Sequence, residues 1–184
     1  MKEIDVKYLA DCLDYNHISG DLVWKKRPRN HFKTDRVTKI WNTRFSGRVA
    51  GTVSRGEDLY TRIRIRLCGS MYLAHRIAWA LHYGEWPKPN LQIDHINGDA
   101  TDNRIINLRV VSNQENSKNS RMNKNNASGF SGVSWSKQSG KWKVRIHISG
   151  KETHIGSFQK IEDAVVARKM AEKKYGYHAN HGRA

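Results

Sequence analysis

The chain has 184 residues and carries 33 lysines and arginines against 17 aspartates and glutamates, which gives a formal net charge of +16 and an isoelectric point near 10.1. At about 150 residues per domain, this length fits one domain or two small ones. Apolar residues make up 38% of the chain and include six tryptophans, which excludes a wholly disordered protein. No apolar run approaches the roughly 18 residues of a membrane span, and the charged N-terminus does not resemble a secretory signal, so we expect a cytoplasmic protein. The two cysteines, Cys12 and Cys68, are too few for a cysteine-rich zinc site or a disulfide scaffold.

Positive charge is concentrated in the two flanks of the chain. Residues 1–67 hold 15 basic and 8 acidic side chains, residues 117–184 hold 14 and 4, and the central residues 68–116 hold 4 and 5. Basic flanks suit a polyanion, because each neutralised phosphate releases counterions and strengthens binding. A near-neutral centre suits a place where a carboxylate holds a cation. A ribosomal or other structural RNA binder would explain this composition equally well.

The N-terminal third predicts a short helix and two strands. One apolar face predicts the helix over 3–14, and residues 22–24 predict a strand. Residues 25–58 are basic and loop-rich, so we expect irregular structure there. Residues 60–67 alternate strictly, which predicts a strand with an apolar face and a basic outer stripe (Arg62, Arg64 and Arg66). The stripe is either a solvated face or a track for phosphates.

The next predicted element is a helix over 71–83, where apolar residues recur at helical spacing. Gly84 supplies its C-terminal stop, and Pro87 follows just beyond. His75 lies on this helix, and we favour a structural role for it over a DNA contact.

The central segment predicts two strands and the start of a helix. The first strand covers 91–96, turn residues occupy 97–99, and the second strand covers 108–111. Ser112 and Glu115 stand at the spacing of a capping box, so a helix should begin there.

A second module is predicted after a linker. Residues 117–129 are rich in Asn, Ser and Lys and nearly free of apolar side chains, which is typical of a linker. Beyond it the pattern predicts three strands and one helix, over 131–137, 141–149, 151–157 and 162–175. We expect the last residues, 178–184, to fray.

Four polar side chains lie within or beside the apolar segments of the centre. Asp94 and His95 end the first strand, where both can line one pocket, and Asn107 and Asn116 follow. Hydrolysis of a phosphodiester requires a base that activates water and a cation that holds the developing charge. Neutral His95 can accept the proton, and Asn107 can fix the imidazole tautomer. Asp94 and the Asn116 oxygen are hard ligands suited to magnesium or manganese. An Asp–His pair alone is, however, more often a turn or a cap than a catalytic site.

Longer motifs add to this interpretation. The stretch AHRIAWALHYGEWP, followed by IDHINGDATDNRIINLRVVSNQEN, resembles the HNH homing-endonuclease family common in bacteriophages. Residues 129–176, with GV, KW-V-I, GK, IGSF and EDA--AR, resemble an AP2-type DNA-binding domain, and this pairing of modules is typical of the family.

The resemblance implies an α+β fold, in which a ββα-metal (HNH, His-Me finger) nuclease core is joined to a C-terminal three-stranded antiparallel sheet packed on one helix (AP2-like). The expected domains are an N-terminal helix and strand/loop extension over 1–60, the nuclease core over 61–120, a linker over 121–128 and the AP2-like domain over 129–177.

Carried over by position, the resemblance implies that His95 is the general base, that Asp94 is a metal ligand and that Asn107 orients the base. The third position of the name-giving motif, a histidine, is Asn116 here. This departure occurs in an H-N-N subgroup of phage enzymes in which the asparagine ligates the metal. It implies one divalent ion, magnesium with manganese as the alternative, and no zinc.

The strand that begins at Lys141 separates an apolar face at even positions from a basic or titratable face at odd positions. The resemblance implies that this sheet face enters the major groove, whereas alternation alone also allows a merely soluble face. Trp135 is either a core residue or a sugar-stacking contact. The predicted DNA-binding residues are Arg62, Arg64, Arg66, Lys118, Arg121, Lys124, Lys137, Lys141, Lys143, Arg145 and His147.

Together these features predict a metal-dependent, site-specific DNA endonuclease of the homing type that hydrolyses phosphodiester bonds by nicking or double-strand cutting. We expect double-stranded DNA as the partner, no membrane, no small-molecule cofactor and a monomer rather than a dimer, encoded by a phage in a bacterial host. The alternative is a non-catalytic AP2-like DNA-binding regulator with a degenerate nuclease fold. A structural RNA binder would explain the charge but not the central polar cluster.

Overall fold

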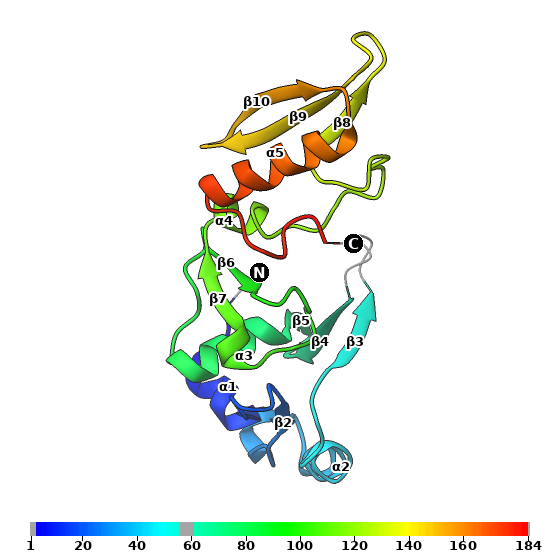
Figure 1. Cartoon of the computed structure of the whole chain (residues 1–184). Helices are drawn as coiled ribbons and strands as arrows, with labels where there is room; N and C mark the ends of the chain where they lie inside the picture. Colours follow the sequence, from blue (N-terminus) through cyan, green and yellow to red (C-terminus); the bar gives the residue numbers. More distant parts are fainter. Residues whose placement is uncertain (1–2, 56–60, 184) are drawn as a thin grey trace. The chain divides into compact units, whose positions relative to one another are not determined.

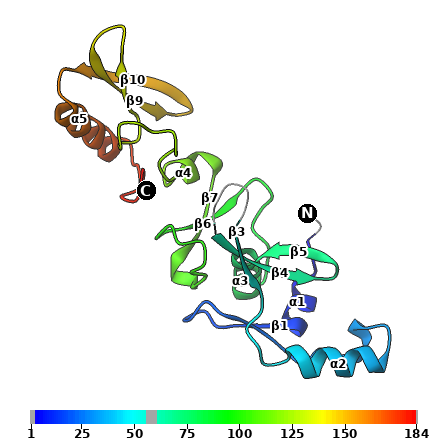
Figure 2. The same cartoon turned by 90° about the vertical axis from the view of Figure 1, so that its right-hand side faces the viewer.

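The computed structural model describes residues 3–55 and 61–183, which form a mixed α+β fold (Figures 1 and 2). The chain divides into two compact units, Met1–Val110 and Val111–Ala184. The predicted domain bounds, including the linker over 121–128, stay predictions. Across the described residues, no helix has the length and apolar character that a membrane crossing requires.

The first unit begins with a helix and a hairpin. Helix α1 (Val6–Cys12) starts after Asp5, whose side chain accepts a hydrogen bond from the Lys7 amide, and it is shorter at both ends than predicted. Strand β1 (Leu13–Tyr15) follows directly and pairs antiparallel with β2 (Leu22–Trp24), the predicted strand.

The expectation of irregular structure over 25–58 is wrong for part of that range. It contains the 3₁₀ turn η1 (Arg29–His31), helix α2 (Asp35–Phe45) and strand β3 (Thr52–Arg55), and residues 56–58 lie outside the described residues. Thr34 caps α2 through its hydroxyl, which accepts from the Val37 amide. The helix buries no residue fully and packs against the core through the half-buried Trp41 and Phe45, and the Trp41 ring lies 5.2 Å from that of Trp24. Two partly buried aromatic side chains are a weak signal for a helix in a basic segment. Figure 2 shows α2 along its length.

A three-stranded antiparallel sheet follows, with β4 (Thr61–Leu67) between β3 and β5 (Ser70–Leu73). The predicted alternation on β4 is confirmed, because Ile65 and Leu67 are buried and Arg66 is exposed. Tyr60, its predicted first residue, lies outside the described residues.

The predicted helix over 71–83 begins later than expected. Residues 71–73 belong to β5, where Leu73 pairs with Arg64 and Met71 with Arg66. Helix α3 therefore covers Ala74–Tyr83, and it ends at Gly84, which adopts the left-handed conformation at φ 77° that the sequence predicts for a C-cap. Sheet pairing outweighs helical spacing over these three residues.

The centre of the first unit contains two paired strands, β6 (Gln92–His95) and β7 (Leu108–Val111), which lie side by side in Figure 1. A 3₁₀ turn, η2 (Ile105–Asn107), leads into β7. Both strands match the predicted ones closely. They join a core made by residues from α1, the hairpin, the sheet and α3, including Leu9, Leu13, Ile65, Ile77, Ile93 and Leu108.

The second unit begins with α4 (Asn113–Ser117), where both arms of the predicted capping box are present. Its sheet has the antiparallel order β10–β9–β8, and α5 covers one face (Figure 1). The elements are β8 (Val133–Ser136), β9 (Lys141–Ile148), β10 (Lys151–Phe158) and α5 (Ile161–Lys174). The alternation on β9 is confirmed, because Val144 and Ile146 are buried whereas Arg145 and His147 are exposed.

The expectation that the last residues fray is wrong for the described part, 178–183. The Gly182 amide donates to the Ser120 carbonyl, and the Met122 amide donates to the Arg183 carbonyl, each at 2.9 Å. His181 is buried beside Arg168 of α5, which forms an ion pair with Glu172. These buried polar partners hold the tail against residues 118–122.

Candidate active site

The site of the first unit is built at the end of β6. Asp94 and His95 are its last two residues, and both are buried, at 8% and 7% exposure. The strand stops there because the chain turns: the Gly98 amide donates to the His95 carbonyl, while the Ile96 amide still donates to Asn107 across the hairpin. Two adjacent polar side chains are thus both withdrawn from water. That they line one pocket stays a prediction.

The His95 ring is held by two neighbours. Its Nε2 lies 3.2 Å from Oδ1 of Asn103, and the ring of His75 packs edge-on at 5.0 Å. Burial lowers the pKa of His95, against the opposing effects of the Asn103 hydrogen bond and the Asp94 carboxylate. The imidazole is therefore neutral near pH 7, the state in which a histidine can accept a proton.

His75 is a site residue that the sequence interpretation treated as structural. It lies on the first turn of α3 and is buried, and burial, followed by the charge of His95, lowers its pKa to about 3. Its neutral ring therefore packs edge-on against the ring of His95. No DNA contact is needed to explain it.

Asp94 forms an ion pair that the sequence analysis missed. Arg109 of β7 donates to Oδ2 of Asp94 from Nε at 3.0 Å and from Nη2 at 2.8 Å. A charged residue inside the apolar run Leu108 to Val111 is the signal that could have revealed it, because such a residue needs a partner. Arg109 supplies the counter-charge for the buried carboxylate.

Asn107 is held on the loop between β6 and β7. Its Oδ1 accepts from the Asn97 amide at 2.9 Å, and its Nδ2 donates to the Asp102 carbonyl at 2.8 Å. Asp102 also binds the Arg104 guanidinium, which holds the pKa of that carboxyl at about 2. Both described bonds of the Asn107 side chain thus go to the loop, and its orienting role toward His95 stays a prediction.

Asn116 lies on α4, in the second unit, whereas the other three predicted residues lie in the first. Asp94 and His95 are adjacent, and Asn107 closes the loop that follows them. The approach of Asn116 to Asp94 stays a prediction.

Asp94 supplies a buried carboxylate, a kind of ligand that Mg²⁺ accepts in proteins. The same carboxylate accepts both bonds from Arg109 at Oδ2. Over residues 3–55 and 61–183, no group of three or more His, Cys, Asp or Glu side chains is placed to hold a metal.

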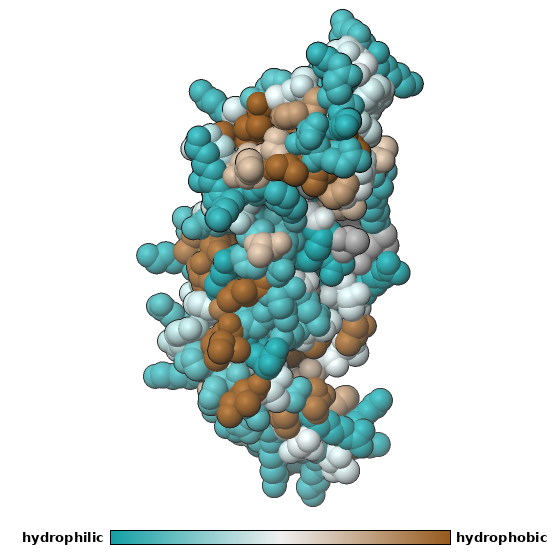
Figure 3. Space-filling model, viewed as in Figure 1, coloured by the Kyte–Doolittle hydropathy of each residue, from teal (hydrophilic) through white to brown (hydrophobic). Residues whose placement is uncertain are grey.

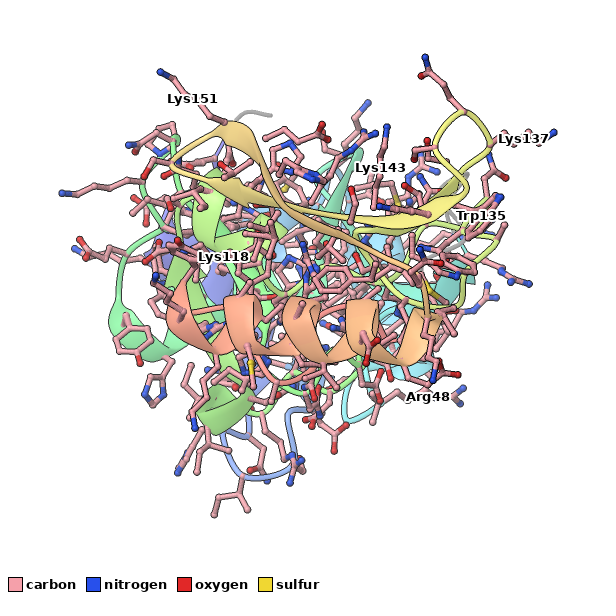
Figure 4. The ribbon with its side chains drawn as sticks, turned by 45° about the horizontal axis from the view of Figure 1, so that its top comes forward. Arg48, Lys118, Trp135, Lys137, Lys143 and Lys151 are labelled. Atoms are coloured by element: carbon pink, nitrogen blue, oxygen red, sulfur yellow. The ribbon has the colours of Figure 1, made fainter. Side chains whose placement is uncertain are left out.

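The predicted DNA-binding residues occupy the surfaces of both units. On β4, Arg66 is exposed while Arg62 and Arg64 are half-buried. In the second unit Lys118 donates to the Tyr175 carbonyl at 2.8 Å, and the remaining predicted residues are exposed or half-buried: Arg121, Lys124, Lys137, Lys141, Lys143, Arg145 and His147. Figure 4 shows Lys137 and Lys143 reaching away from α5, and Figure 3 shows that the face in view is largely hydrophilic.

Trp135 is not a core residue. Its side chain is 48% exposed on β8 and lies edge-on to Trp142, with 5.2 Å between ring centroids. Its register partner is Trp142, so it lies on the face of the even-numbered residues of β9 and not on that of Lys143 and Arg145. The core alternative is wrong, and the stacking contact stays a prediction.

Fold and site together define a mixed α+β protein with a buried, neutral histidine at the end of a two-stranded hairpin. Residues 72–118 match the sequence pattern of the HNH endonuclease family. Protein 3.8 of Escherichia phage T7 is 35% identical over 88 residues, which cover 48% of this chain and 72% of the phage protein. The chain therefore belongs to the same family as that phage protein and carries an HNH endonuclease domain. HNH nucleases generally use a divalent metal.

This chain is also similar to a solved structure of the HNH homing endonuclease I-HmuI, which was studied for DNA binding and cleavage. The match has a TM-score of 0.40 and 22% sequence identity, and it covers 65% of this chain and 57% of that one. The chain thus spans little more than half of that enzyme.

Proposed function

We propose that this protein is a metal-dependent, site-specific DNA endonuclease of the homing type that hydrolyses phosphodiester bonds. The observation that carries the proposal is the pair Asp94 and His95, buried together at the end of β6 within the region matched to the HNH endonuclease family. A buried pair of this kind costs solvation free energy, which a catalytic role would explain.

In this reaction His95 accepts a proton from the attacking water, which adds to phosphorus as the ester oxygen leaves. Its buried position excludes bulk water from one side of the ring and keeps the imidazole neutral. Asp94 and Asn116 would hold a divalent ion, magnesium or manganese. When bound, that ion stabilises negative charge on the phosphate and on the leaving oxygen.

The second unit is proposed to act as an AP2-type DNA-binding domain. Three antiparallel strands covered on one face by α5 leave the other face to the side chains of β9 that point away from the helix. Under this proposal, Lys143 and Arg145 on that strand contact phosphates or base edges of double-stranded DNA. With one proposed active site per chain, a monomer would nick one strand per binding event.

Incubation of the purified protein with supercoiled phage DNA and magnesium tests the proposal. Nicked or linear products are expected from the wild type and none from His95→Ala, while both proteins shift the DNA on a gel. His17→Ala, at an exposed histidine between β1 and β2, is the matched control for loss of an imidazole outside the site. Equal cutting by wild type and His95→Ala would remove His95 from its role.

A specific observation favours the alternative, a non-catalytic DNA-binding regulator with a degenerate nuclease fold. The Asp94 carboxylate is already neutralised by Arg109, whose guanidinium opposes a metal ion at the same place. Under this alternative, the wild type would shift DNA and cut none of it with magnesium or manganese.

A further inference from the structure

Asn103 occupies a central position between the N-terminal hairpin and the proposed base. It is 2% exposed, and its side-chain Oδ1 lies 3.2 Å from Nε2 of His95. Its backbone carbonyl accepts a hydrogen bond from the Tyr15 hydroxyl at 2.7 Å. One buried residue thus joins β1 to the ring of His95.

Tyr15 is a fixed donor in this chain of contacts. It ends β1 and packs with the partly buried residues around the first core. Burial raises the pKa of its hydroxyl to about 12, so the group remains protonated under all ordinary conditions. Its proton is directed at the Asn103 carbonyl.

The turn of the β1–β2 hairpin also lies directly against the backbone of this segment. Gly20 has φ 83°, and a Cβ there would lie 2.6 Å from the Arg104 amide nitrogen and 2.8 Å from the Asn103 carbonyl carbon. The Ile105 amide donates to the His17 carbonyl at 3.3 Å. Only glycine permits so close an approach at this backbone conformation.

An amide oxygen accepts hydrogen bonds and donates none. With Asn103 Oδ1 as the acceptor at 3.2 Å, Nε2 of His95 is the ring nitrogen that donates, and Nδ1 is the one that would act as the base. The described bonds of the Asn107 side chain go instead to the loop, at Asn97 and Asp102.

We propose that Asn103 is the positioning residue that fixes the orientation and tautomer of His95, and that Tyr15 and the hairpin turn hold Asn103 in place. The inference rests on the proposed nuclease function for its catalytic consequence. It also gives residues 13–24 a role as a brace of the site, where the sequence analysis left the N-terminal extension without a defined one.

Cleavage kinetics on saturating DNA test the catalytic consequence. Asn103→Leu keeps the approximate volume and removes the acceptor, so kcat should fall about 10–100-fold, the effect usual for partners that orient a functional histidine, with KM changed less than about twofold. Asn103→Asp restores an oxygen acceptor and should recover most of the lost kcat. Tyr15→Phe should lower kcat by a smaller factor, and Tyr83→Phe, at an exposed tyrosine of α3, should match the wild type. Wild-type kcat in Asn103→Leu would overturn the inference.

A second measurement separates this inference from the proposed function. Nitrogen-15 NMR of the histidine rings at pH 8 reports which ring nitrogen carries the proton, and the His95 signals are identified by their loss in His95→Gln. The wild type should show the Nε2–H form, and Asn103→Leu should show a mixture of both tautomers. An Nδ1–H form in the wild type overturns the inference even if the protein cuts DNA. A wild type that cuts no DNA overturns the proposed function, while the tautomer still decides the role of Asn103.

If Asn103→Leu does not fold, as judged by circular dichroism, Tyr15→Phe and Asn103→Asp carry the test. Both keep the polar surroundings of His95, and Tyr15→Phe removes only a hydroxyl. An unchanged kcat and an unchanged His95 spectrum in Tyr15→Phe would remove the hairpin from the positioning role.

Discussion

The hairpin site of the first unit and the sheet of the second unit use charge in opposite ways. Around β6 and β7, Asp94, His95, Asn103 and Asn107 are buried, and they have defined partners, as in Asp94 with Arg109 and His95 with Asn103. On β9, Arg145 is exposed, Lys141 and Lys143 are half-buried, and both side chains of the Arg145–Glu152 pair are about half exposed. Burial costs solvation free energy but fixes the positions of the side chains, and catalysis requires fixed positions. Exposed cations cost little and attract phosphates over long distances, which suits binding.

Breaking the buried ion pair is the strongest test of this contrast. Arg109→Leu leaves the Asp94 carboxylate, 10% exposed in its side chain, without its counter-charge. The free energy of unfolding should fall by about 2–3 kcal/mol, less than for a fully buried pair because Arg109 is partly exposed. Urea denaturation measures the change. Arg36→Leu, at an exposed position of α2, is the control and should change stability by less than about 0.5 kcal/mol. Equal effects of the two substitutions would contradict the contrast.

The buried His75 should make the stability of the first unit depend on pH, and this tests the effect of burial on a polar group. Its folded pKa of about 3 lies below the usual value of 6.5, so the unfolded chain binds a proton first as the pH falls. This one group should lower the free energy of unfolding by about 2 kcal/mol between pH 6.5 and 5. Denaturation curves at both values measure it. His75→Gln should lose this part of the dependence, and the exposed His17→Gln should keep it.

Removing exposed cations should have the smallest effect on the protein and act on binding alone. Lys143→Ala combined with Arg145→Ala should weaken DNA binding about tenfold at moderate salt and lower the slope of log affinity against log salt by about 2. Titration at several salt concentrations measures both. Lys173→Ala combined with Lys174→Ala removes the same charge from the end of α5 and is the control. An equal loss from both pairs would mean that net charge, not the sheet face, holds DNA.

Most of the strands could be predicted from the sequence because alternation requires only local information. The sequence predicted the alternating residues of β4 and β9 and the capping box of α4, and the structure confirms all three. Helix α2 could not be predicted from the sequence, because it packs through the half-buried Trp41 and Phe45 and buries no residue fully. Strand β5 was not predicted, because residues 71–73 also fit the helical spacing and only their pairing with β4 identifies them as a strand.

The candidate site divides in the same way. Asp94 and His95 could be named because they are adjacent and end an apolar strand. Their partners could not, because Arg109 and Asn103 are chosen by the pairing of β6 with β7 and by the path of the loop between them. Tyr15 is 88 residues from Asn103 in the chain, so no local pattern connects the two. The choice of partner belongs to tertiary structure.

The bonds between the tail and residues 118–122 have a consequence for the flexibility of the second unit. Backbone hydrogen bonds from Met122 and to Ser120 give this stretch the protection of an ordered strand, although its composition is that of a spacer. Lys118 is half-buried and donates to the Tyr175 carbonyl, whereas Lys124 is exposed. A protease that cleaves after basic residues should therefore reach Lys124 before it reaches Lys118.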